Sequence, residues 1–193
     1  MQTGTQKGLA PVKFVVDASA SQFSVQAFAT GLLSSFGHNP RIAIGDYDGD
    51  IHFLPGTYEQ AAVRVNVRTA AMEVLDEMKN DDRKKLEKLM YGEVLSVERF
   101  ATAAFESQKI AVQKLNDDLL TAHVTGDLSF HGASQNLSFE ARVTTMENML
   151  RISGGFSLRQ SDYGIKPVSF AGGALRLKDE LKFSFELVAR KQD

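Results

Sequence analysis

The chain has 193 residues, of which 43% are hydrophobic and 24% are charged, and its formal net charge is −2. This composition is typical of an ordinary globular protein, and the small net charge excludes the strong basic footprint of a nucleic-acid-binding domain. The sequence contains no cysteine, which excludes disulfides and thiolate metal sites. No apolar run approaches the roughly 18 residues that a membrane-spanning helix needs.

The sequence predicts a single domain over residues 11–190, preceded by a flexible tail at residues 1–10. The tail is polar and lacks the apolar run of a secretory signal. Because the chain begins with Met, we expect a cytoplasmic protein, or a periplasmic one if a leader has been removed. With 4 prolines and no polar gap or repeat, the sequence gives no support for a domain boundary.

Alternation of apolar and polar residues dominates the chain after the tail. Val63, Val65 and Val67 alternate with polar side chains, and the same period of two returns over residues 137–143 and 181–187. This period gives each strand one dry and one wet face, which is typical of antiparallel sheets. Less regular signals bring the count to about nine or ten strands. They cover residues 22–28, 50–54, 102–109, 124–130, 150–158 and 173–178.

The segment from Met72 to Met90 departs from this period. Its apolar residues recur at spacings of three and four, which predicts helix. The polar run over residues 80–82 predicts a turn that caps a second helix. We therefore expect one or two short helices, with Arg83–Tyr91 the more regular, and the charges over residues 81–88 indicate a solvated helix face.

Strands with one apolar face must bury that face and pair their edges, and two packed sheets or a closed barrel would do both. Large inward residues on nine or ten strands would leave a barrel centre wider than side chains easily fill. Such a lumen favours an apolar guest, because each methylene moved into it from water gains about 0.8 kcal/mol. The sequence thus predicts an all-β antiparallel β-barrel that holds a hydrophobic small molecule or lipid. The alternative is that the phenylalanines form a packed core.

We expect the ligand-binding residues on the inward strand faces, in the loop before residue 40 and on the helix. The predicted strand residues are Phe23, Val25, Phe53, Val65, Phe105, Leu128, Phe130, Phe156 and Phe183. His38 is predicted to lie near the polar end of the ligand, and Leu86 and Leu89 are predicted to close one end of the barrel. Such a site binds by apolar burial with few polar contacts, and no cofactor is expected.

Several short motifs follow one another along the chain in a fairly specific order. They are Phe14-Val15-Val16-Asp17 with Ser19, Ser21 and Phe23; Phe36-Gly37-His38-Asn39; Asp48-Gly49-Asp50-Ile51-His52-Phe53; Phe105-Glu106-Ser107; Val124-Thr125-Gly126-Asp127-Leu128 through His131-Gly132; and Ser161-Asp162-Tyr163-Gly164-Ile165. In order and spacing, these motifs resemble the YceI-like family of lipid- or polyisoprenoid-binding proteins, roughly from Lys13 to Ala189.

The resemblance implies a lipocalin-like antiparallel barrel with a long apolar tunnel and no catalytic residues. It also implies that a homodimer is common, and an exposed strand edge would make a dimer easy to form. Two positions depart from the family pattern: Phe100-Ala101 stands where a Tyr-Pro pair is usual, and Ala133-Ser134 where a Val-Thr pair is usual. Many members are periplasmic, so the missing signal is a further departure.

Two other functions stay open on the sequence alone. A hydrolase or isomerase acting on an apolar substrate would use His38 or His131 with Asp127 or Asp162 as its acid–base group. A structural or stress-related protein would instead have a filled barrel and bind a partner on its surface.

Neither of two metal-like patterns predicts a metal site. None of the four histidines pairs at a metal-ligand spacing, although a composite site such as His38 with His131 stays open. The run Asp46, Asp48 and Asp50 lacks the glycine and the final glutamate of a calcium loop.

Overall fold

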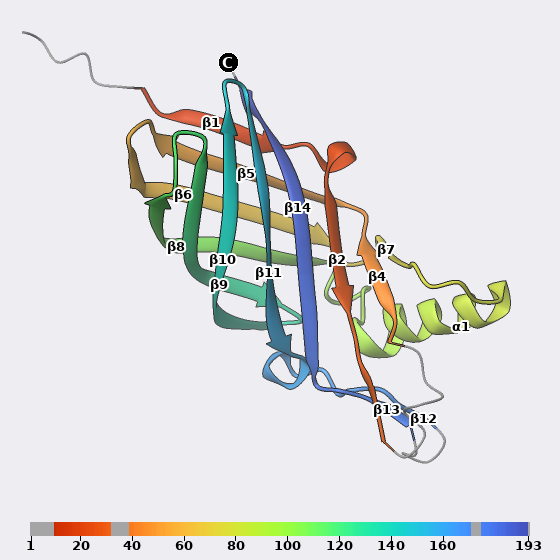
Figure 1. Cartoon of the computed structure of the whole chain (residues 1–193). Helices are drawn as coiled ribbons and strands as arrows, with labels where there is room; N and C mark the ends of the chain where they lie inside the picture. Colours follow the sequence, from red (N-terminus) through yellow and green to blue (C-terminus); the bar gives the residue numbers. More distant parts are fainter. Residues whose placement is uncertain (1–9, 32–38, 171–174, 193) are drawn as a thin grey trace, which may run out of the picture.

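The computed structural model describes residues 10–31, 39–170 and 175–192 of the chain (Figure 1). Long antiparallel strands dominate it, and one helix lies beside the sheet. Among the described residues, no helix is both long enough and apolar enough to cross a membrane.

Eight antiparallel strands form a closed ring, because the last strand pairs with the first. In ring order they are β1 (Val12–Val16), β5 (Tyr47–Leu54), β6 (Thr57–Arg68), β8 (Thr102–Lys114), β9 (Leu119–Phe130), β10 (Ala133–Met146), β11 (Met149–Arg159) and β14 (Glu180–Gln192). The closing pair runs from Lys13 opposite Gln192 to Val16 opposite Ala189. The predicted antiparallel barrel is therefore confirmed.

Three short strands extend this ring on one side of β14. They are β2 (Gln22–Gln26), β4 (Arg41–Ile44) and β7 (Met72–Val74), and their order from β14 is β2, β4, β7. Each is a chain neighbour of a ring strand: β2 follows β1 after the 3₁₀ turn η1 (Ala18–Ala20), β4 precedes β5, and β7 follows β6. The closed ring is thus smaller than nine or ten strands, because two of the predicted segments, residues 22–28 and 173–178, contain strands β2 and β13 (Leu175–Leu177) outside the ring.

A second, three-stranded sheet stands at one end of the barrel in Figure 1. It consists of β12 (Ser169–Phe170), β13 (Leu175–Leu177) and β3 (Ala29–Thr30). A 3₁₀ turn, η4 (Gln160–Tyr163), leads from β11 towards it.

The helical segment begins later than the sequence pattern predicts. Met72–Val74 is strand β7, so a helix from residue 72 was wrong, and helix α1 covers Asn80–Leu89. Met72 and Val74 are buried while Glu73 is exposed, and pairing with β4 overrides the local helical spacing. The expected cap is also wrong, because the N-cap is Lys79 and it makes no side-chain hydrogen bond. The helix predicted over residues 83–91 is confirmed by α1 and the π-helix η3 (Met90–Val94).

Side chains of the helical segment occupy the outer edge of β7. Among the described strands, β7 pairs with β4 alone. The backbone carbonyl of Met72 accepts a hydrogen bond from the Tyr91 hydroxyl, and that of Val74 accepts one from the Arg83 guanidinium. These bonds satisfy acceptors that an edge strand would otherwise present to another chain.

Gly126 allows two barrel strands to approach closely. The β8–β9 pairing shifts register between Ser107 and Lys109, directly opposite Gly126. A Cβ atom at position 126 would lie 2.2 Å from the carbonyl oxygen of Glu106 and 2.7 Å from the Cα atom of Ser107. Only glycine fits this bulge, because a side chain there would overlap backbone atoms.

Candidate functional site

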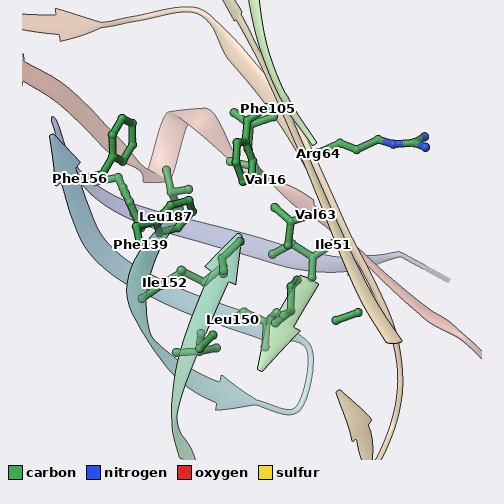
Figure 2. A pocket seen from close by; sticks show the side chains of 18 of the residues that line it. Val16, Ile51, Val63, Arg64, Phe105, Phe139, Leu150, Ile152, Phe156 and Leu187 are labelled. Carbon is green, nitrogen blue, oxygen red and sulfur yellow. The ribbon is translucent and has the colours of Figure 1, made fainter. Parts of the chain in front are cut away.

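The barrel encloses a cavity of about 180 Å³, which we call the first cavity. Side chains from all eight ring strands line it, because alternation turns every second residue of each strand inward. Figure 2 shows Phe139 and Phe156 on one side of this cavity and Ile51 and Val63 across from them. Among the predicted ligand-binding residues, the lining contains Phe23, Phe53, Val65, Phe105, Leu128 and Phe156.

Arg64 brings no charge into the first cavity. Although the residue borders the cavity, its side chain points away from the other lining residues in Figure 2. Its guanidinium donates two hydrogen bonds to Oε1 of Glu106, at 3.0 Å from Nε and 2.8 Å from Nη2. Among the described lining residues, none is Asp, Glu, His or Lys. The wall therefore suits an apolar ligand group and offers no ionic partner to a charged one.

A second cavity of about 150 Å³ lies between the sheet extension and the helical segment. Strands β2 and β4 supply Val25, Ile42 and Ile44, and the helical segment supplies Leu86 and Leu89. The apolar side chains of α1 therefore line a cavity as well as facing the sheet. Among the predicted ligand-binding residues, this lining contains Phe23, Val25, Leu86, Leu89, Leu128, Phe130, Phe156 and Phe183.

The structure thus gathers eleven of the twelve predicted residues around two adjoining cavities. The twelfth, His38, lies outside the described residues. Its neighbour Asn39 accepts a hydrogen bond from the backbone N–H of Ala29 at 2.8 Å. Contact of these residues with a ligand stays a prediction.

Sequence reasoning missed much of the aliphatic wall of the first cavity. Ile110 on β8 and Leu120 on β9 are both buried and line this cavity. The missing signal was strand length: β8 and β9 both extend past their predicted limits. Small inward residues such as Ala103 and Ala122 were also missed, because alanine has no strong strand preference.

Tyr47 carries a buried phenol in the wall of the first cavity. The residue is 6% exposed, and its Oη atom has no hydrogen-bond partner. Burial raises the pKa of Tyr47 above its ordinary value of 10.0, and the nearby Ser21 side chain offsets part of the rise although it is not in hydrogen-bond geometry. The phenol therefore stays neutral near pH 7. A general acid or base works best with a pKa close to the working pH, so the shift of Tyr47 does not suit it to that role.

His131 belongs to a hairpin and lines neither cavity. With φ values of 50° and 79°, His131 and Gly132 form the two-residue turn between β9 and β10. The Nδ1 atom of His131 lies 3.1 Å from the carbonyl oxygen of Tyr163, and its ring packs 4.2 Å from that of Phe100. Within the described part of the chain, His131 makes no hydrogen bond to Asp127 or to Asp162.

The acidic run after β4 pairs with an arginine. Nη1 of Arg68 lies 2.9 Å from Oδ2 of Asp48 and 3.3 Å from Oδ1 of Asp46. The pKa of Asp48 is lowered, first by the hydrogen bond from Asn66 and then by Arg68. Among the described residues, no group of three or more His, Asp or Glu side chains converges as metal ligands would.

These features define a closed antiparallel β-barrel with an apolar interior. A family model for the YceI-like domain matches residues 14–189. The chain belongs to the YceI-like family, as its sequence motifs indicate. Comparison with curated proteins gives no match.

Three solved structures show the same fold. BcnA of Burkholderia cenocepacia is 17% identical, with a TM-score of 0.70 over 90% of this chain and 98% of that chain. A polyisoprenoid-binding domain from Saccharophagus degradans, implicated in plant cell wall breakdown, is 12% identical, with a TM-score of 0.67 over 95% of this chain and 99% of that one. The YceI protein of Campylobacter jejuni is 16% identical, with a TM-score of 0.60 over 81% and 88% of the two chains.

Proposed function

We propose that this protein binds a hydrophobic, lipid-like molecule inside the barrel. The observation that carries the proposal is the pair of adjoining cavities whose described walls are almost wholly apolar. Space of this kind is poorly hydrated, and transfer of an apolar chain into it from water is favourable. Membership of the YceI-like family and the likeness to a polyisoprenoid-binding domain support the same function.

The ligand class follows from the chemistry of the walls. An ionised head group inside the lumen would lose its hydration and meet no opposite charge on the described walls, so it must stay outside. An isoprenoid, a fatty acid or a fatty amide would meet this condition with its chain inside. Its binding would serve transport, storage or sensing.

A binding role fits the lumen better than catalysis does. The acid–base group that an enzyme would need was expected from His38 or His131 with Asp127 or Asp162. His38 lies outside the described residues, and none of the other three residues lines a cavity. Among the described lining residues, the titratable group with a shifted pKa is Tyr47, and burial raises that pKa away from neutrality. A filled, purely structural barrel is disfavoured by the two cavities themselves.

Binding of a fluorescent fatty-acid probe tests the proposal when a cavity-filling variant is compared with its control. Ala122 on β9 lines the first cavity, so Ala122→Phe fills space that the ligand would occupy. Ala111 on β8 is exposed on the outer face, opposite His123, so Ala111→Phe adds the same group outside. We expect at least a tenfold loss of affinity for Ala122→Phe alone. Equal affinities in all three proteins would contradict binding in the lumen.

A further inference from the structure

The two cavities meet at a boundary built from a few shared residues. Phe23, Val67, Ala103, Leu128 and Phe156 line both of them. A group that passed from one cavity to the other would therefore touch these five side chains.

One side of this boundary is a row of phenyl rings set by strand register. On β14, alternation turns Phe183 and Phe185 inward; Phe156 stands opposite Phe183, and Phe23 opposite Phe185. The rings of Phe156 and Phe183 stack with centroids 4.7 Å apart, and those of Phe23 and Phe183 lie 6.2 Å apart. Interlocked rings of this kind are held in place by one another, so this side of the boundary is stiff.

The other boundary residues are aliphatic, namely Val67, Ala103 and Leu128, and Ala103 is the smallest of them. Ala103 on β8 stands opposite Val67 on β6 in the strand register. In the ring of eight strands, β8 is four strands away from β14, so this pair faces the phenyl row across the lumen. The single methyl group of Ala103 therefore leaves the space between the two sides open to a chain.

Each cavity alone holds only a short guest. A dry apolar cavity of about 150 Å³ accommodates a molecule of about the size of benzene. The two cavities here have about 180 and 150 Å³. A long lipid chain must therefore occupy both, and must cross the boundary to do so.

We infer that the two cavities are successive segments of one site, and that Ala103, facing Phe23 and Phe156, determines how long a lipid chain the barrel accepts. The inference rests on the proposed function and adds to it a residue that selects for chain length. A larger side chain at position 103 would close the passage and restrict the ligand to one segment.

Straight-chain primary alcohols from hexanol to hexadecanol test the inference, with affinity measured by displacement of a fluorescent probe. In the wild-type protein, affinity should rise by roughly fourfold per methylene until the chain fills both cavities, as continued apolar burial requires. For Ala103→Phe we expect the same rise among the short alcohols and a plateau among the long ones. The longest alcohols should then bind at least a hundredfold more weakly than they bind the wild type.

The matched control is Ala104→Phe, which adds the same ring one residue further along β8. Position 104 falls on the opposite strand face by alternation, beside Asn66 and Ser129 of the neighbouring strands. This variant should follow the wild-type series. Ala103→Leu is a smaller obstruction that serves if the phenylalanine variant does not fold, and it should also weaken the long alcohols selectively.

Two results would overturn the inference, and they are distinguishable. If Ala103→Phe and Ala103→Leu both show the wild-type rise in affinity over the whole series of alcohols, position 103 does not select chain length. Binding in the barrel would still stand in that case. If no alcohol of any length binds the wild-type protein, the proposed function itself fails and the inference fails with it.

Discussion

Arg83 of α1 donates a hydrogen bond from Nη2 to the backbone carbonyl of Asp76, 2.9 Å away. The same guanidinium donates to the carbonyl of Val74 at the end of β7. Three and six residues further along, Leu86 and Leu89 of the same segment line the second cavity. Arg83 thus attaches helix α1, which covers the second cavity, to strand β7 beside that cavity.

Loss of this attachment should speed ligand exchange. We expect Arg83→Ala to release a bound fluorescent fatty acid roughly tenfold faster, because hydrogen bonds from charged groups contribute about 1.5–3 kcal/mol. Stopped-flow release into excess unlabelled fatty acid measures the rate. Lys84→Ala is the control, since Lys84 is an exposed neighbour on the same helix. Equal release rates for the two variants would show that α1 does not limit exchange.

Gly126→Ala should destabilise the barrel strongly. The added Cβ atom would overlap the backbone of β8, which cannot move aside as a flexible side chain would. We expect a loss of at least about 2 kcal/mol of unfolding free energy, as for other overpacked positions. Denaturant unfolding provides the measurement.

The control for this experiment is Gly92→Ala in the π-helix. No atom lies within 4 Å of a Cβ atom at position 92, and a helical alanine is favoured over glycine by up to about 1 kcal/mol. Gly92→Ala should therefore leave stability unchanged or raise it. A Gly126→Ala protein as stable as this control would mean that the register shift in β8 does not require glycine.

His131→Asn tests whether His131 supports the hairpin alone or also contacts the ligand. Asparagine tolerates the left-handed backbone at this turn, but it loses the ring contact with Phe100. We expect a fall of a few degrees in melting temperature and an affinity for fatty acid within about twofold of the wild type, because His131 lines neither cavity. A tenfold loss of affinity with an unchanged melting temperature would place His131 in the binding site.

Acid should weaken the seam that closes the barrel. Oδ1 of Asp17 accepts a hydrogen bond from Ser19 at 2.6 Å, and Oδ2 accepts one from Arg190 at 2.7 Å. These contacts, that of Ser19 first, lower the pKa of Asp17 below its ordinary 3.8. Because the pKa is lower in the folded state, the stabilisation is complete well above pH 3.8 and is lost as the pH falls through the folded pKa.

Melting temperatures of the wild type and Asp17→Asn over pH 7 to 3 test this linkage. Asp17→Asn should be less stable at pH 7 and should lose less stability on acidification. Parallel curves for the two proteins would indicate that Asp17 is not a source of the acid sensitivity.

Much of the fold could be predicted from the sequence because alternation is a local signal. Residues 63–67, 137–143 and 181–187 lie within β6, β10 and β14, and their apolar members turn inward or are partly buried. The strand pattern placed nine of the predicted ligand residues around the cavities, and helical spacing placed the other two, Leu86 and Leu89. These inferences needed only the period of two and the closure of the sheet.

The remaining features depend on contacts between distant segments. Met72 and Val74 have helical spacing with the residues after them, but pairing with β4 makes them a strand. Likewise, the boundary at Ala103 exists because β8 faces β14 across the ring, a relationship that no short stretch of sequence contains. The sequence also gives no signal for the role of an alanine such as Ala103, because that role comes from the small size of its side chain and the space left beside it.

Binding of a lipid in the barrel has a decisive test, which is the identity of the molecules that the purified protein carries. The protein would be denatured, extracted with organic solvent and analysed by mass spectrometry, with Ala122→Phe purified in parallel. We expect a long-chain lipid in near-stoichiometric amount from the wild type and a strong depletion of that lipid from the variant. Equal traces of lipid from both proteins, together with no uptake of fatty acid or alcohol by either, would contradict it.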